Sequence, residues 1–174
     1  MNSRDAAEKK SGVFVMTSKP SPNIEPEEMK KILTNEETGY LALCDEGEPY
    51  VVPMSYAYLD GKIFAHCALT GRKLDIIKKN SKVCFVVSRH PDRAKPHHAE
   101  GKCIYRYESV MCFGEARIVE KPEERLPLLI EFKRHFYARL GLDTEKDPVT
   151  MKAAEHCGCI VISINSMTGR KKNS

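Results

Sequence analysis

The sequence lacks several features that assign a chain to a common class of protein. No apolar run reaches the roughly 20 residues that a membrane-spanning helix needs, so we expect no association with a membrane. There is no G-x-S-x-G motif, no G-x-G-x-x-G motif and no P-loop. Internal repeats and low-complexity tracts are also absent. The common motifs of serine hydrolases, dinucleotide-binding dehydrogenases and P-loop NTPases are therefore missing.

The sequence also has little excess of charge of one sign. Its 28 Lys and Arg residues exceed its 24 Asp and Glu residues only slightly, for a net charge of +4 and a pI near 8.6. A nucleic-acid-binding domain usually carries a stronger basic cluster on one face. We therefore expect no nucleic-acid partner, although a weakly basic surface is compatible with an anionic small ligand.

The seven cysteines do not form a recognisable framework. Seven is an odd number, the residues are scattered, and no secretory signal is recognised, which is typical of reduced thiols in a cytoplasmic protein. Structural zinc sites usually show paired C-x-x-C or H-x-x-x-H spacings. Here only Cys157 and Cys159 form a C-x-C pair. We therefore interpret the three histidines of the loop over residues 89–102 as solvated and predict no metal site.

The order of the predicted elements indicates a mainly β, α+β protein. At 174 residues, one domain is expected. We predict a loose N-terminal arm over residues 1–22, a single domain over residues 23–170 and a basic tail over residues 171–174. Strand patterns outnumber helical ones and follow one another as hairpins, whereas a doubly wound parallel sheet would need helices between most strands. The pattern therefore predicts an antiparallel barrel with a few peripheral helices.

Turn residues and apolar periodicity divide the chain further. The predicted strands cover residues 40–44, 49–59, 63–65, 82–88, 104–119 and 159–164, and the predicted helices begin near residues 26, 71, 122 and 148. The continuous apolar run of residues 82–88 predicts a strand buried on both faces. Pro53, inside a strand, indicates an edge, a bulge or open backbone, and Gly114 indicates a bulge or a close backbone approach.

The most informative stretch, residues 63–80, begins as a strand and ends as a helix. Between them, Gly71 frees the backbone for a turn. Backbone N–H groups at a helix start attract an anion, and Thr70, Arg72 and Lys73 add a hydroxyl group and two cations there. A phosphate group would fit this turn. The alternative is a surface loop whose cations are only solvated.

Three motifs occur in order along the chain: P-x-S-Y at residues 53–56, D-G-x-I-x-x-H-x-A-x-x-G-R-K at residues 60–73, and Y-x-S-V-x-x-F-G at residues 107–114. Over about residues 25–170, the chain therefore resembles the pyridoxamine 5′-phosphate oxidase-related flavoproteins. Within them, it is most similar to the 5-nitroimidazole resistance (Nim-type) branch.

The resemblance implies a split β-barrel that binds FMN, with FAD possible, in a groove between the protomers of a homodimer. It implies that Val52, Pro53, Met54 and Ser55 lie along the isoalloxazine ring. It further implies that the phosphate is surrounded by His66, Cys67, Ala68, Thr70, Gly71, Arg72 and Lys73. Ser109 and Val110 match a serine-valine pair that completes the pocket, and Thr168-Gly169-Arg170 matches a T-G-K-like ending.

The resemblance also implies a function. His66 is expected near the flavin and open to substrate, which makes it the candidate catalytic residue; the alternative is a histidine that only hydrogen-bonds within the barrel. We expect a cytoplasmic flavin-dependent oxidoreductase whose substrate is a nitroaromatic compound or a similar small-molecule electron acceptor. One alternative is a non-enzymatic carrier or sensor that binds flavin or haem. Haem is kept as an alternative because histidine is a common haem ligand and residues 89–102 are rich in histidine. A true pyridoxamine phosphate oxidase is disfavoured because the sequence does not display the full set of basic residues expected to bind its substrate.

Overall fold

Two tight turns join the first three strands into consecutive hairpins. The computed structural model describes residues 24–90 and 107–172. Within them, β1 (Thr38–Asp45), β2 (Glu48–Leu59) and β3 (Lys62–Cys67) are separated by two-residue turns. The turn residues Glu46, Gly47, Asp60 and Gly61 all have positive φ. This backbone conformation matches the right-handed twist of the flanking strands, so the predicted hairpins are confirmed.

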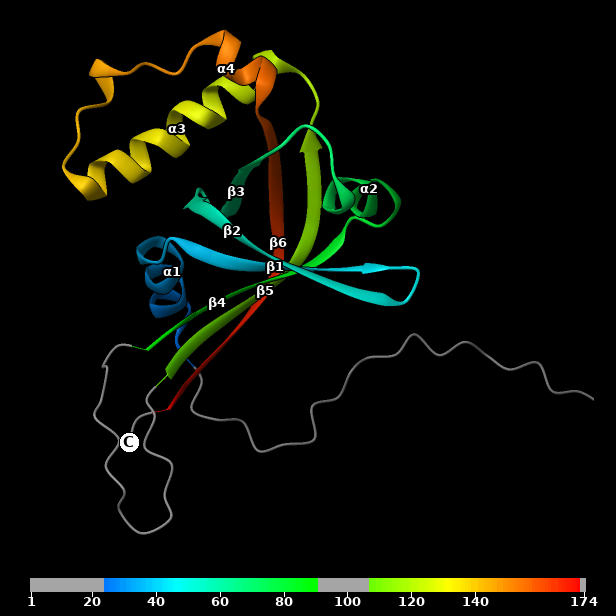
Figure 1. Cartoon of the computed structure of the whole chain (residues 1–174). Helices are drawn as coiled ribbons and strands as arrows, with labels where there is room; N and C mark the ends of the chain where they lie inside the picture. The colour runs from blue at the N-terminus through cyan, green and yellow to red at the C-terminus, as the bar shows by residue number, and fades with distance from the viewer. Residues whose placement is uncertain (1–23, 91–106, 173–174) are drawn as a thin grey trace, which may run out of the picture.

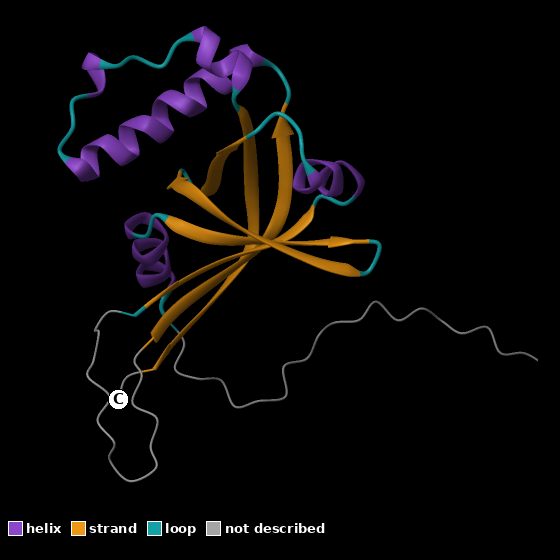
Figure 2. Ribbon diagram, viewed as in Figure 1, coloured by secondary structure: helices purple, strands orange, loops and turns teal. Residues whose placement is uncertain are grey.

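The strands of the described residues close into one antiparallel barrel. The others are β4 (Lys82–Arg89), β5 (Tyr107–Val119) and β6 (Gly158–Lys172), and the order around the barrel is β1-β2-β3-β6-β5-β4 (Figures 1 and 2). Every neighbouring pair is antiparallel. The predicted mainly β fold with an antiparallel barrel is therefore confirmed.

Three details of the predicted elements are wrong. Residues 82–88 are not buried on both faces, because Cys84 and Val86 remain partly exposed on the outer face of β4. β6 does not end at residue 164, because pairing with β5 continues to Lys172. The last helix starts later than Asp147-Pro148, since its N-cap is Thr150, whose hydroxyl oxygen accepts a hydrogen bond from the Ala153 N–H group.

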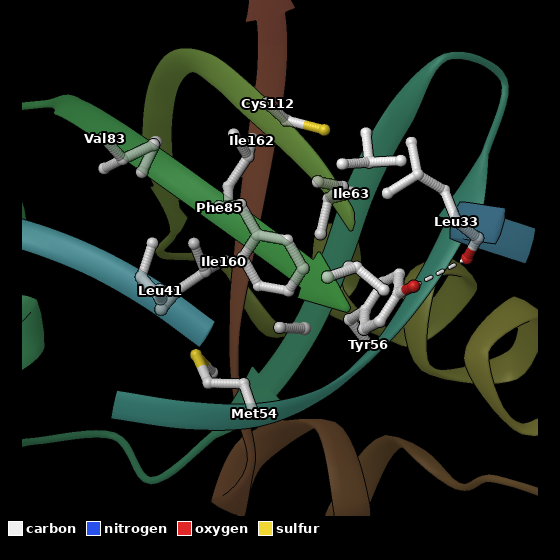
Figure 3. Close-up of a cluster of buried hydrophobic side chains, with 14 of the residues drawn as sticks. Leu33, Leu41, Met54, Tyr56, Ile63, Val83, Phe85, Cys112, Ile160 and Ile162 are labelled. Carbon is white, nitrogen blue, oxygen red and sulfur yellow. Dashed lines mark hydrogen bonds between the residues drawn. The ribbon is translucent and has the colours of Figure 1, made fainter. Parts of the chain in front are cut away.

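The barrel interior holds the main hydrophobic core (Figure 3). Tyr56 and Phe85 lie at its centre, with ring centroids 5.0 Å apart and an interplanar angle of 68°. The buried Tyr56 hydroxyl group donates a 2.7 Å hydrogen bond to the Leu33 carbonyl oxygen in α1 (Pro26–Asn35). This bond fixes α1 against the barrel, and burial raises the pKa of the Tyr56 hydroxyl well above its ordinary value.

A second, smaller core lies between the outer face of β6 and the helices that follow β5. These are α3 (Pro122–Leu140), a 3₁₀ turn (Thr144–Lys146) and α4 (Met151–His156). The buried guanidinium group of Arg125 donates to the carbonyl oxygens of Val119, Glu120, Ala154 and Cys157, which joins α3, α4 and the end of β5. No helix in the described ranges is both long and apolar enough to cross a membrane.

Gly114 allows β5 and β6 to approach closely. The register between the two strands shifts between Phe113 and Gly114. A Cβ atom on Gly114 would overlap the backbone carbonyl of Ser163. The predicted bulge or close approach at Gly114 is therefore confirmed, and the reason is steric.

Replacing Gly114 with Ala tests this packing. We expect Gly114→Ala to lower the free energy of unfolding by about 1–3 kcal/mol, because the backbone of β6 must move to admit the methyl group. Urea unfolding followed by circular dichroism measures the change. Glu115→Ala, at the next, exposed residue of β5, is the control and should stay within about 0.5 kcal/mol of the parent. Equal stability of the two variants would contradict the steric explanation.

Candidate functional site

Different parts of β2 pair with the strands on its two sides. Residues 48–55 pair with β1, whereas residues 56–59 pair with β3. The pairing of β3 with β2 ends at Ala65, whereas its pairing with β6 continues to Cys67. The β3-facing edge of β2 is therefore open before Tyr56. Pro53 lies in this part of β2 with continuous register to β1, so the prediction of an edge position is confirmed.

Alternation along β2 decides which side chains are exposed at the open edge. Pro53 and Ser55 are exposed, whereas Met54 is buried in the barrel and Val52 packs against the same core. Met54 can therefore offer a ligand only its backbone groups. Pro53 and Ser55 can offer side-chain contacts as well.

The turn after β3 leads directly into α2 (Arg72–Lys79). Its backbone depends on Gly71, whose φ of 135° is rarely adopted by other residues. The Gly71 carbonyl oxygen accepts hydrogen bonds from the N–H groups of Leu74 at 2.9 Å and Asp75 at 3.3 Å. The N–H groups of Arg72 and Lys73 come before that of Leu74, the first to donate within the helix, and are left to point out of the helix start. The predicted strand-to-helix turn is confirmed.

Side chains at this turn are accessible. Ala68, Thr70, Gly71 and Arg72 are exposed, and Lys73 is partly buried. The thiol of Cys67 is also partly buried, and desolvation raises its pKa. The structure therefore brings the residues of the predicted phosphate turn together with the start of α2.

Arg72 links this turn to the β1–β2 hairpin. Its guanidinium group lies 3.8 Å from the Asp45 carboxylate and 4.9 Å from the centroid of the Tyr50 ring. Lys79, two turns further along α2, also lies near Asp45, at 3.6 Å. Figure 1 shows the hairpin reaching out from the barrel beneath α2. The turn follows β3, and the open edge belongs to β2. Both therefore lie next to the point where these two strands separate.

Ser109 and Val110 lie on β5, away from the turn and from the open edge of β2. β5 is three strands from β2 in either direction around the barrel, so the two strands lie on opposite sides of it. Val110 is fully buried, and Ser109 pairs with Ser88 and with Arg170 in β6. The predicted site residues therefore form two separate groups within one chain, and the Thr168-Gly169-Arg170 segment lies with the second group.

His66 lies at the start of the open region, one residue after the last β3 residue that pairs with β2. Its ring keeps access to solvent and packs edge-on against Phe132 of α3, with centroids 4.7 Å apart and an interplanar angle of 88°. Within the described residues, the ring nitrogens have no hydrogen-bond partner. Desolvation lowers the pKa of His66, so the ring is neutral at pH 7 and both nitrogens are available to a ligand.

Phe132 is the neighbour that sequence reasoning missed. The sequence patterns above give Phe132 no role, although it lies four residues from both Leu128 and Phe136, and its ring centroid lies 4.6 Å from that of Phe136. That spacing was the available signal. The contact with His66 joins residues 66 positions apart and has no local signature.

A metal centre has no support in the part of the chain that is described. There, no group of three or more His, Cys, Asp or Glu side chains is arranged to hold a metal ion. His97 and His98, two of the loop histidines, lie outside the described residues, as does the predicted N-terminal arm.

Comparisons with known proteins agree with this fold. The family model for pyridoxamine 5′-phosphate oxidase matches residues 25–171, and the chain therefore belongs to this family. A candidate 5-nitroimidazole antibiotic resistance protein of Bacteroides thetaiotaomicron is 25% identical, with a TM-score of 0.68 over 84% of each chain. The resemblance recognised from the motifs is thus confirmed.

Other relatives extend the comparison. Uncharacterized protein RA0666 of Rhizobium meliloti is 25% identical over 152 residues, which cover 83% of this chain and 90% of that protein. A FAD-binding protein of Mesorhizobium loti is 24% identical, with a TM-score of 0.61 over 87% of this chain and 97% of the other. A FAD- and haem-binding protein of Mycobacterium smegmatis is 14% identical, with a TM-score of 0.72 over 86% and 72%. The last two show the shared fold.

The contact between Phe132 and His66 can be tested by titration. Because desolvation lowers the pKa of His66, Phe132→Ala should raise it toward the ordinary value of 6.5 by admitting water to the ring. Nuclear magnetic resonance titration of the histidine ring measures the shift. Phe132→Leu keeps an apolar side chain there and should leave the pKa closer to that of the parent. An unchanged His66 pKa in Phe132→Ala would show that this contact does not desolvate the ring.

Proposed function

We propose that this chain is a flavin-dependent oxidoreductase. It binds FMN, or the FMN half of FAD, where β2 and β3 separate. The observation that carries the proposal is the Gly71-Arg72-Lys73 turn, which starts α2 beside the open edge of β2. Membership of the pyridoxamine 5′-phosphate oxidase family and the similarity to flavin-binding proteins support it.

The donors at the turn fit a phosphate group. Two backbone N–H groups point out of the helix start, where the helix dipole favours negative charge. Arg72 can bind two phosphate oxygens through its planar guanidinium group, and Lys73 adds a mobile point charge. The Thr70 hydroxyl group is exposed at the same turn. This set contains only donors, apart from that hydroxyl, and therefore suits an anion.

The open edge of β2 fits the edge of a planar ring. Among the described residues, no strand pairs with the backbone groups of residues 52–55 that face away from β1. They can form hydrogen bonds with the polar atoms of an isoalloxazine ring, while Pro53 and Ser55 contact its surface. A bound flavin supplies the redox chemistry, and the chain supplies binding, orientation and electrostatics.

His66 is the residue that we assign to the substrate side. Its neutral ring, held by Phe132 beside the open edge, can donate or accept a hydrogen bond at an oxidised group such as a nitro group. The Bacteroides relative makes a small nitroaromatic compound the substrate class that we favour.

The outer face of the barrel supports a homodimer. Cross-strand pairs place apolar side chains side by side over β2, β1, β4 and β5. Val51, Pro53, Tyr40, Met111 and Phe113 are exposed, and Val86 among them is partly exposed. Tyr40 is 45% exposed, Val51 57% and Phe113 41%. A continuous apolar face of this kind is typical of a protein–protein interface. A second copy would also supply Ser109, which within one chain lies on the opposite side of the barrel from β2.

A charge on this face should disrupt the dimer. We expect Met111→Glu to be monomeric and to retain less flavin, because the carboxylate would be buried without a partner and the partner's Ser109 would be lost. Size-exclusion chromatography with light scattering measures the mass. Ile130→Glu, at an apolar residue of α3 that is 36% exposed, is the matched control and should remain dimeric. A dimer of Met111→Glu would place the interface elsewhere.

Removing the two cations of the turn tests the phosphate assignment. We expect Arg72→Ala with Lys73→Ala to weaken flavin binding by about 1.5–3 kcal/mol for each charged hydrogen bond lost. Titration of flavin fluorescence measures the affinity. The control, Lys30→Ala with Lys31→Ala, removes two cations from α1, which lies across the barrel from α2 (Figure 1). Unchanged affinity in the first variant would sink the phosphate assignment.

The absorbance spectrum of the purified protein tests the function as a whole. Paired near-ultraviolet and blue bands would identify an oxidised flavin, and NADH- or NADPH-driven reduction of a nitroaromatic compound would identify the activity. A Soret band would favour the haem-binding alternative. Bound flavin without turnover would favour a carrier or sensor, and a colourless protein that takes up no flavin would refute the proposal.

A further inference from the structure

A cavity of about 190 Å³ lies between α2, the end of β5 and the start of β6. Its wall combines apolar and charged side chains; the main ones are Leu69, Leu74, Ile118, Lys78, Glu120 and Arg125. Among the described residues that line it, none belongs to the turn over residues 70–73. The cavity is therefore separate from the place that we assign to the flavin phosphate.

Arg125 is a buried cation in the wall of this cavity and is only 8% exposed. Its guanidinium group donates four hydrogen bonds to backbone carbonyl oxygens, which belong to Val119, Glu120, Ala154 and Cys157. A guanidinium group has five N–H groups. At least one of them, on Nη2, therefore has no partner within the described residues.

These hydrogen bonds do not neutralise the charge of Arg125. Carbonyl dipoles satisfy N–H groups but carry no net charge, and in the described part of the chain no carboxylate forms an ion pair with Arg125. Buried charges are usually paired, because an isolated charge is costly in a low-dielectric surrounding. An anion in the cavity would supply the missing charge and accept a charge-assisted hydrogen bond from the remaining N–H group.

The apolar part of the wall suits a single ring. Leu74 is buried, Ile118 is partly buried, and Leu69 is 46% exposed, which places it at the mouth of the cavity. An apolar cavity of roughly 150 Å³ is large enough to bind benzene. The present volume of about 190 Å³ therefore leaves room for one ring with a carboxylate. It lies below the roughly 300–1,000 Å³ of a site for a drug-sized ligand.

The other two charged groups favour a ligand with one negative charge. Lys78 is exposed on α2 and has no ion-pair partner within the described ranges. The exposed carboxylate of Glu120 lines the same cavity and would repel a second negative charge on the ligand. Arg125, Lys78 and Glu120 together carry one net positive charge. A monocarboxylate therefore fits better than a dicarboxylate or a phosphate.

The cysteine in the wall is not suited to react with such a ligand. Burial raises the pKa of the Cys159 thiol to about 12. The thiol is therefore protonated at pH 7, whereas the thiolate is the nucleophilic form. The cavity is thus suited to binding rather than to covalent chemistry.

From these observations we infer that the cavity binds a small aromatic monocarboxylate of about the size of benzoate. The carboxylate accepts a hydrogen bond from Arg125, and the ring lies among Leu69, Leu74 and Ile118. The inference does not depend on the proposed flavin site, because none of the residues to which we assign flavin contacts lines this cavity.

Benzoate is the probe, and benzamide, which has nearly the same size but no charge, is its matched control. Calorimetric titration of the full-length protein should show one benzoate site per chain. Benzamide should bind at least about tenfold more weakly, because the charged hydrogen bond is lost. Phthalate, with its two carboxylates, should also bind more weakly than benzoate. Nuclear Overhauser effects from the benzoate ring should reach the methyl groups of Leu69, Leu74 and Ile118.

Two exposed positions of the wall allow substitutions that leave the core intact. Lys78→Met removes a cation and should weaken benzoate binding about two- to fivefold, as expected for an exposed charge. Lys31→Met, on α1, is its control and should leave the affinity unchanged. Leu69→Glu adds a carboxylate at the mouth and should weaken binding by about tenfold or more. Leu142→Glu makes the same change at a leucine that is 53% exposed outside the cavity and should have no effect.

Several outcomes would overturn the inference. These are no saturable binding of benzoate, equal affinity for benzoate and benzamide, and Overhauser effects that reach other residues instead. Displacement of benzoate by FMN would also overturn it, since benzoate would then occupy the flavin site. A protein that binds benzoate in this cavity but takes up no flavin would support the inference and refute only the proposed function.

Discussion

The end of the ladder between β2 and β3 is the constraint on which the rest of the site depends. The two strands pair only from Tyr56 and Ala65 to the turn at Asp60-Gly61. Beyond this point β2 stays with β1, and β3 stays with β6. The backbone of β2 is thereby left with polar groups that need a partner, because unpaired backbone groups are costly when they are covered. A ligand can satisfy them without breaking any other pair of strands.

The interior of the barrel keeps this opening in place. Tyr56, the last β2 residue on the paired side, is fixed by its buried hydrogen bond to α1 and by its contact with Phe85. The strands cannot close the gap by sliding, because a shift of one residue would exchange buried and exposed side chains along β2. On the outside, α3 places Phe132 against His66 beside the same opening. The site is thus built on rigid elements.

Sequence reasoning identified the parts whose cause is local. The hairpin turn at Asp60-Gly61 and the turn conformation of Gly71 each depend on a few neighbouring residues. The end of β6 was missed because residues 165–172 are mostly polar or basic and are extended only through pairing with β5. The Phe132 contact was missed for a related reason. It depends on how distant segments pack, which periodicity does not encode.

The contacts of Arg72 show how the turn can be organised before a ligand binds. The Asp45 carboxylate and the Tyr50 ring hold the guanidinium group near the helix start, yet the side chain is 57% exposed. An exposed ion pair of this kind contributes only about 0–1 kcal/mol. A charged hydrogen bond to a phosphate contributes about 1.5–3 kcal/mol. Exchange of the carboxylate for a phosphate is therefore favourable, and the side chain has lost part of its conformational freedom in advance. The hairpin that carries Asp45 and Tyr50 is also the hairpin that carries the open edge, so the same element positions both ends of the proposed flavin site.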